Sequence, residues 1–522
     1  MPSPRPPFAS SWASPFRPLG ALGVAYGVAL MAAWVAVRAG VVDAPGASSW
    51  HAHEMLYGFA GAIVCAIVLT ALPGWAGTPE LRGAPLAAIV LLWIAARAGY
   101  WLRDALPAAL AGALACALWV VLGLVLARQL ARLAQRTWLA LLVVVAGLAA
   151  GEALFFAGQA QAGERTGLHA IVLLFALAGG LFTPVFTGNH LRLAGRGAQA
   201  SFLMPLELAA VASIVALAAL DLAAAPPRAL AAAAFAAFAV HGVRLARWRG
   251  WKALDAPLLW TMHAGYAWLV AAFLLFGLGA AGFPVAAQAW LLAFTVGALG
   301  SMMIGLLTRV ALRHTGRPLA IPHDIVAAFL LVQVAALARV GGALAGANAS
   351  WIVVAGRAWA AAVAIYLRRY GAVLTSPSLP RAGASPLPTD TPPPPAGPRR
   401  CHPCPSPAEA DVTPPRYANP LIAPPTRPMP RHVGIVGAGT IGPDIGYYLK
   451  SALPDLSLTL VDVAQAPLDA ALARFADYAR KAVARGKMSA ARAAEVTRTL
   501  EGSLDYDALA GCDWVIAAAT ER

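Results

Sequence analysis

Long apolar runs recur along the first 370 residues of this 522-residue chain. Each run holds about 20 residues, enough for a helix to cross the roughly 30 Å hydrocarbon layer of a bilayer. Inside a bilayer only helices and closed barrels satisfy all backbone hydrogen bonds, and continuous apolar runs favour helices. The sequence therefore predicts an all-α polytopic membrane protein. We predict twelve spans, near residues 19–38, 55–76, 84–101, 105–127, 138–157, 168–187, 202–224, 227–245, 258–279, 283–307, 324–346 and 351–371.

The composition agrees with a membrane protein, because 60% of the residues are hydrophobic and only 12% are charged. Soluble domains carry about 25% charged residues. The formal net charge of +15 is spread over many loops and does not gather on one face, which argues against nucleic acid as a partner. If the N-terminus is cytoplasmic, the inward loops hold thirteen Lys and Arg and the outward loops hold four. This bias predicts that both termini are cytoplasmic.

Two changes in composition divide the chain into three parts. Residues 371–430 contain 19 of the 41 prolines, a composition that favours extended polyproline II over a packed core. After this stretch, short apolar runs alternate with charged amphipathic segments, as in a soluble α/β unit. We therefore predict a membrane domain over residues 1–371, a proline-rich linker over 372–430 and a C-terminal domain over 431–522.

Two histidines, His51 and His53, stand at the start of the second predicted span, followed by Glu54. In an extended or irregular loop, residues i and i+2 point the same way, so both rings could face one metal or haem. Glu54 could then fix the orientation of one imidazole, as carboxylates often do beside metal-bound histidines. The alternative is that these polar residues only cap a helix at the water interface.

Two further histidines lie in blocks that could hold a prosthetic group. His263 stands among aromatic residues in the ninth span, where a hydrogen bond between helices is the alternative role. His314 ends the tenth span beside Arg309 and Arg313. Such a basic cluster suits carboxylates, including haem propionates, or equally lipid headgroups.

The blocks at residues 51–58, 263–268 and 295–318, in this order, resemble the NnrS family of bacterial membrane proteins over roughly residues 10–370. The resemblance implies a twelve-span protein of the bacterial inner membrane that is associated with the response to nitric oxide and contains haem and copper. On this resemblance, the candidate metal ligands are His51, His53, His263 and His314.

The C-terminal domain opens with a glycine motif, Gly437, Gly439 and Gly442, directly after the predicted strand 432–437. A second predicted strand ends at Asp462, 20 residues after Gly442. In this context the glycines and the following helix bind a pyrophosphate, and the carboxylate accepts hydrogen bonds from a ribose. Asp462 favours NAD over NADP, since a carboxylate would repel a 2′-phosphate. The motif predicts a Rossmann-like NAD-binding unit.

Residues 431–522 resemble the start of the NAD-binding domain of 3-hydroxyacyl-CoA dehydrogenases, and we interpret the tail as a truncated, partial domain of that kind. In that family the catalytic histidine and its glutamate partner lie beyond the matching part. The resemblance therefore assigns no catalytic residue to this chain, and whether the chain is an enzyme stays open.

The sequence is compatible with three functions. The first is a haem- and copper-associated membrane protein of the nitric-oxide response. The second is a membrane transporter, for which twelve spans are equally suitable. The third is an NAD-dependent oxidoreductase of fatty acid metabolism acting through the tail. The predicted partners are the lipid bilayer, nitric oxide and NAD.

Overall fold

The computed structural model describes residues 7–44, 47–76, 78–131, 139–197, 199–346, 349–379, 430–439, 442–453, 455–484 and 488–518. The predicted linker lies almost entirely outside these ranges. The chain divides into two compact units, a membrane unit and a C-terminal unit.

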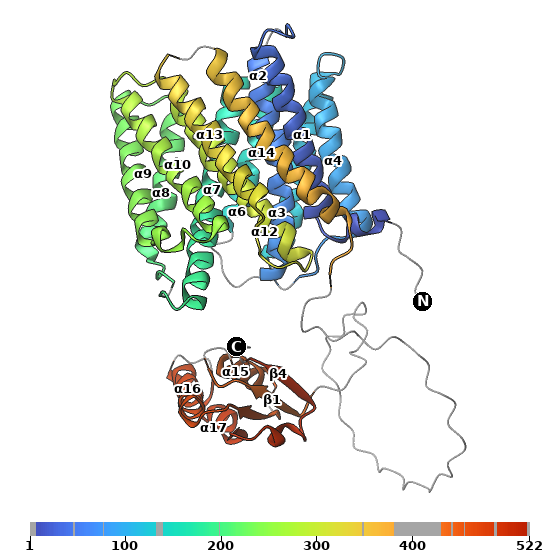
Figure 1. Ribbon diagram of the computed structural model, residues 1–522, viewed down its shortest axis with the longest axis vertical. Coiled ribbons are helices and arrows are strands. Elements are labelled where there is room, and N and C mark those ends of the chain that lie inside the picture. Colours follow the sequence, from blue (N-terminus) through green and yellow to red (C-terminus); the bar gives the residue numbers. More distant parts are fainter. Residues whose placement is uncertain are drawn as a thin grey trace, which may run out of the picture. The chain divides into compact units, whose positions relative to one another are not determined.

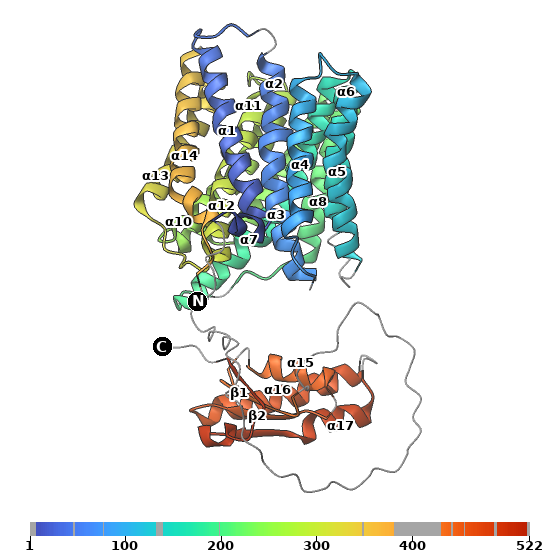
Figure 2. The same ribbon diagram turned by 90° about the vertical axis from the view of Figure 1, so that its right-hand side faces the viewer.

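The membrane unit is a bundle of long helices that run side by side (Figures 1 and 2). A short 3-10 helix, η1 (Pro7–Ala13), precedes them. The helices of the bundle are α1 (Phe16–Arg38), α2 (Ala47–His53), η2 (Glu54–Ala60), α3 (Gly61–Ala76), α4 (Gly83–Trp101), α5 (Ala108–Leu130), α6 (Ala140–Phe156), α7 (Ala160–Leu193), α8 (Met204–Leu222), α9 (Pro227–Arg247), η4 (Gly250–Ala253), α10 (Pro257–Ala280), α11 (Ala289–Leu292), η5 (Ala293–Leu299), α12 (Gly300–His314), α13 (His323–Leu344) and α14 (Ala349–Thr375).

Within the described part of the chain, eleven helices are long and apolar enough to cross a membrane. The remaining predicted span is α6, an apolar helix of 17 residues. At 1.5 Å per residue α6 is about 25 Å long. Two crossings are composite, since α2, η2 and α3 form one span and α11, η5 and α12 form another. The predicted polytopic all-α fold is confirmed.

Each composite span contains one π-helical segment, η2 or η5. Such segments are rare and often lie at functional sites. Both are closely packed. At Gly297 in η5, for example, an added Cβ would lie 2.5 Å from the indole ring of Trp268 on α10. The two segments also overlap the sequence blocks at residues 51–58 and 295–318, on which the resemblance to the NnrS family rests.

The first and last spans are neighbours, because α1 packs along α14 as well as along α3. We call the end of the bundle where α1 begins the near end, and the opposite end the far end. Consecutive spans run in opposite directions, so α2 begins at the far end and α10 begins at the near end (Figures 1 and 2).

The C-terminal unit is an α/β sandwich with a four-stranded sheet in the order β3-β2-β1-β4, and every neighbouring pair is parallel. Buried residues of β1 and β2 pack against Phe475 of α16. This confirms the predicted Rossmann-like unit. Its elements are β1 (His432–Val436), α15 (Gly442–Ala452), β2 (Ser457–Val461), α16 (Gln465–Ala484), α17 (Ala490–Arg498), β3 (Leu500–Ser503), η6 (Tyr506–Leu509) and β4 (Trp514–Ala517).

Candidate functional site

The second span begins earlier than predicted, so His51 and His53 lie inside helix α2 and not in a loop. Residues i and i+2 of a helix point about 200° apart. The expectation that the two rings face the same way is therefore wrong. The contacts of the two side chains differ accordingly, because His51 packs on α1 whereas His53 points into the bundle.

His53 is fully buried and lies between two buried carboxylates. Its Nδ1 is 2.9 Å from Oε1 of Glu54, and its Nε2 is 3.0 Å from Oε2 of Glu152 on α6. The ring stacks on Tyr100 with 4.1 Å between ring centroids. Glu54 thus contacts His53 as expected, but the partner of the second nitrogen is another carboxylate.

Arg97 of α4 joins the two carboxylates. It donates to Oε1 of Glu54 at 2.5 Å and to Oε1 of Glu152 at 3.3 Å. Tyr26 of α1 donates to Glu54 and accepts a 2.7 Å hydrogen bond from the indole of Trp101. We call Tyr26, His53, Glu54, Arg97 and Glu152 the His53 network. It connects α1, the second span, α4 and α6 at one place in the bundle.

The geometry of the His53 network fixes the number of protons that it holds. A neutral imidazole has one N–H, whereas both nitrogens of His53 face carboxylate oxygens. One more proton must therefore lie on the imidazole or on one of the carboxyl groups. With a proton on the imidazole, His53 and Arg97 balance Glu54 and Glu152, so no net charge is buried. Neither nitrogen of His53 is free in this arrangement.

Glycines allow this region to close tightly. Tyr57 of η2 donates to the carbonyl of Gly163 at 2.7 Å. An added Cβ would lie 2.1 Å from the Tyr57 hydroxyl at Gly151 and 2.2 Å from it at Gly167. Only glycine lets α6 and α7 approach the tyrosine this closely.

His51 lies near the far end and stacks on Trp34 of α1, with 4.3 Å between ring centroids and 12° between planes. Its Nδ1 is buried and has no hydrogen-bond partner among the described residues. His51 is thus an imidazole with an unused nitrogen inside an aromatic environment.

His263 lies in the second turn of α10, at the near end. The Thr187 hydroxyl donates to the carbonyl of Thr183 at 2.7 Å, so it accepts from Nε2–H of His263 at 2.9 Å. This leaves Nδ1 of His263 with a lone pair. Gly250 packs against the ring, where an added Cβ would lie 2.5 Å from Nδ1.

His314 is the last residue of α12, which also ends at the near end. The hydroxyl of Ser378 donates to its backbone carbonyl at 3.2 Å. The four predicted ligands are thus divided between the two ends of the bundle. No group of three or more His, Cys, Asp or Glu side chains arranged to hold a metal ion occurs among the described residues. The four histidines do not fit one shared metal centre.

A second buried polar cluster lies around Arg244 of α9. Arg244 donates to the carbonyl of Ala176 at 2.9 Å and to the Tyr266 hydroxyl at 2.8 Å, and it pairs with Glu207. His241 is 3.2 Å from the Ala210 carbonyl, so its Nε2 carries the proton and its Nδ1 accepts from Tyr266 at 2.8 Å. In these hydrogen bonds, which we call the Arg244 network, the donor and acceptor roles of all groups are mutually consistent.

The sequence contains one signal for the Arg244 network, which we did not predict. His241 and Arg244 are three residues apart and therefore lie on one face of α9. Arg244 falls at the end of the predicted span 227–245, and its side chain is buried in the bundle. Glu207, like Glu152 of the His53 network, is a carboxylate within a predicted span, but the sequence does not reveal its partner.

The glycine motif of the C-terminal unit has the local geometry that the sequence predicted. Gly437 directly follows β1 and has φ +104°, a conformation that favours glycine. At Gly442 an added Cβ would lie 1.9 Å from the Gly437 carbonyl oxygen, whereas at Gly439 it would meet nothing within 4 Å. Asp462 accepts from the Ala438 amide at 2.7 Å, so the carboxylate stands against the glycine loop.

Comparison with known proteins identifies both units. Residues 10–378 match the family described as NnrS protein. This match covers more than half of the chain. The chain belongs to the NnrS family. Residues 432–522 match a second family, described as the 3-hydroxyacyl-CoA dehydrogenase, NAD binding domain. This NnrS protein therefore carries an NAD-binding domain as its tail.

One solved structure similar to the tail is (S)-3-hydroxybutyryl-CoA dehydrogenase PaaH1 from Ralstonia eutropha. The sequences are 35% identical over 18% of the NnrS protein and 32% of the dehydrogenase, with a TM-score of 0.17. The NnrS protein thus spans about a third of the length of that enzyme.

Proposed function

We propose that this NnrS protein is a haem- or copper-associated protein of the bacterial inner membrane that acts in the response to nitric oxide. Membership of the NnrS family supports the link to nitric oxide. Ionisable residues inside spans are costly and commonly mark functional sites, and two such networks lie in this bundle.

The observation that carries the proposal is the unused nitrogen of His51. A neutral imidazole nitrogen is a ligand that both copper and haem iron accept. His51 at the far end and His263 at the near end each keep such a nitrogen. We therefore propose them as ligands of two separate sites. His53 suits a structural role better, because both of its nitrogens are engaged, and His314 stays a candidate beside the near-end arginines.

The proposed orientation places the near end in the cytoplasm. Thirteen Lys and Arg residues lie in or beside the connections that this orientation puts inside, against four in those outside. Cytoplasmic connections retain positive charge, so this bias supports the orientation. Both termini are then cytoplasmic.

Spectroscopy and metal analysis of the purified full chain test the proposal. After expression with haem and copper supplied, we expect a Soret band or bound copper that decreases in His51→Ala and in His263→Ala. His190→Ala is the matched control, because His190 is partly exposed and pairs with Asp255 at 3.2 Å. Wild-type protein without haem or copper under these conditions would overturn the proposal.

The NAD-binding tail supports a second candidate, an NAD-dependent oxidoreductase of fatty acid metabolism. The observation in its favour is the glycine loop with Asp462 beside it. The test is a titration of the full chain with NAD, followed by an assay with a 3-hydroxyacyl-CoA. We expect NAD to bind. Turnover of the thioester would establish the second candidate, and binding without turnover would reject it.

A further inference from the structure

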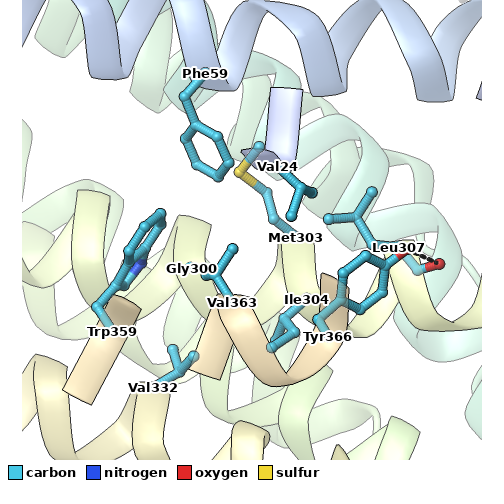
Figure 3. A pocket seen from close by; sticks show the side chains of 10 residues that line it. All are labelled: Val24, Phe59, Gly300, Met303, Ile304, Leu307, Val332, Trp359, Val363 and Tyr366. Atoms are coloured by element: carbon cyan, nitrogen blue, oxygen red, sulfur yellow. Dashed lines mark hydrogen bonds between the residues drawn. The ribbon is translucent and has the colours of Figure 1, made fainter. Parts of the chain in front are cut away.

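A cavity lies where the two composite spans meet α1, α13 and α14 (Figure 3). Its volume is about 20 Å³. The lining residues come from all five helical segments and include Val24, Phe59, Gly300, Met303 and Val332. Each of these is at least nine-tenths buried, so the cavity belongs to the interior of the bundle.

The surface that the wall exposes to this cavity is apolar. Tyr366 is the residue with a hydroxyl in the wall, and that hydroxyl donates to the backbone carbonyl of Leu307 at 3.3 Å, as the dashed line in Figure 3 shows. A water molecule needs two to four polar partners, and apolar cavities of this kind stay dry. A volume of 20 Å³ exceeds the roughly 10–15 Å³ that one water-sized molecule requires. The cavity thus has room for one very small apolar molecule.

The cavity also lies beside the ends of two π-helical segments. Phe59 belongs to the π-helical segment η2, and Gly300 directly follows the π-helical segment η5. These are the two π-helical segments among the described residues of the bundle, and π-helical turns are frequent at functional sites. The irregular turns of both composite spans therefore end at one apolar cavity.

We propose that this cavity binds a small apolar diatomic gas, and that nitric oxide is its occupant. Nitric oxide is nearly apolar, dissolves readily in hydrocarbon and needs no hydrogen-bond partner. It gains dispersion contacts with the surrounding side chains that an empty cavity lacks. The choice of nitric oxide rests on the proposed function, whereas the gas site rests on the cavity alone.

Dissolved oxygen is the probe, because it is a paramagnetic diatomic of similar size and polarity that speeds the relaxation of methyl groups that it contacts. The full chain labelled at its methionine methyls offers an internal comparison. Met303 lines the cavity, whereas Met262 is buried outside it. We expect oxygen to enhance relaxation of the Met303 methyl several-fold more than that of Met262.

Gly300→Ala is the variant that fills the cavity. An added Cβ at Gly300 would lie 3.3 Å from Val332 and 3.6 Å from Trp359, so it fits with a small adjustment. Gly341→Ala on α13 is the matched control, because a Cβ there meets nothing within 4 Å. We expect Gly300→Ala to remove the excess relaxation of Met303 and Gly341→Ala to retain it.

Val332→Ile fills the same space with one methylene and keeps the test decisive if Gly300→Ala does not fold. Equal relaxation of Met303 and Met262 in the wild type, or an unchanged Met303 effect in a folded filling variant, would overturn the gas site. The measurement needs neither haem nor copper nor nitric oxide. Its outcome is therefore separate from that of the proposed function, and replacing oxygen with nitric oxide then tests the occupant.

Discussion

His53 and Glu152 are 99 positions apart in the sequence, and their side chains meet at 3.0 Å inside the bundle. Both are fully buried, and Arg97 links Glu152 to Glu54 on the other side of the imidazole. The charges balance only as a set. Removing one of the carboxylates therefore leaves buried donors of Arg97 and His53 without a partner in an apolar interior.

Glu152→Gln tests this balance. The amide leaves Arg97 and His53 without one carboxylate, so we expect a loss of about 3–5 kcal/mol, the usual cost of breaking a buried ion pair. Thermal unfolding of the full chain in detergent would measure it. Glu164→Gln is the control, because Glu164 is half-buried and makes no ion pair among the described residues. Equal destabilisation by both variants would contradict the role of the network.

Gly167→Ala tests the close approach of α7 to Tyr57. The added methyl would lie 2.2 Å from the tyrosine hydroxyl, and we expect overpacking to cost about 1–3 kcal/mol. The same substitution in a Tyr57→Leu background should cost less, because the clashing ring is gone. A double-mutant cycle on unfolding free energies measures this coupling. If the changes in unfolding free energy are additive, Gly167 and Tyr57 do not interact.

Tyr266→Phe tests the Arg244 network. Without the hydroxyl, Nδ1 of His241 and one N–H of Arg244 lose their buried partner. We expect about 1–3 kcal/mol of destabilisation, the penalty for buried polar groups left unpaired. Tyr370→Phe is the matched control, because the buried Tyr370 hydroxyl has no partner among the described residues. That variant should be neutral, and a similar loss in both would refute the assignment.

Two glycines of the tail should respond differently to alanine. In Gly442→Ala the methyl would meet the Gly437 carbonyl at 1.9 Å, so we expect the loop itself to be destabilised by about 1–3 kcal/mol. In Gly439→Ala the methyl is accommodated, but it occupies the space where the backbone approaches the pyrophosphate. NAD titration and amide exchange in α15 separate these effects. Strong NAD binding by Gly439→Ala would show that the loop does not hold the dinucleotide in this way.

Lys450 gives the tail a predictable dependence on pH. Burial and the neighbouring Arg492 lower the pKa of Lys450, whose Nζ donates to the Leu456 carbonyl at 2.9 Å. Between this lowered pKa and the ordinary lysine value of about 10.4, the unfolded tail binds more protons than the folded tail. Folding stability should therefore rise with pH in that window.

Pulse proteolysis of the tail within the full chain, from neutral pH to about pH 10, measures the trend. Lys450→Met should flatten it, because the titrating group is removed. Lys481→Met is the control, since Lys481 is exposed on α16 and pairs with the exposed side of the same helix through Asp477 at 2.6 Å. If the folding stability of Lys450→Met rises with pH as steeply as that of the wild type, other groups cause the rise.

The sequence by itself determined features that depend on short stretches of chain. Apolar runs of membrane length predicted the bundle, because each helix satisfies its own backbone. The glycine motif and Asp462 predicted the nucleotide-binding turn, because a strand, a tight turn and a helix are all encoded within about 30 residues. In the structure Gly437 has a positive φ, and an added Cβ at Gly442 would meet the Gly437 carbonyl, as a tight turn at this motif requires.

Only the tertiary structure decided which side chains meet. The early start of the second span put His51 and His53 on different faces of a helix, and no local pattern reveals that Glu152 is the partner of one of them. Contacts between spans depend on the order in which helices pack and on the rotation of each about its axis. Small residues such as Gly151 and Gly167, together with the π-helical turns, help to determine the packing and the rotation of the helices. They do so through contacts between residues that are far apart in the sequence.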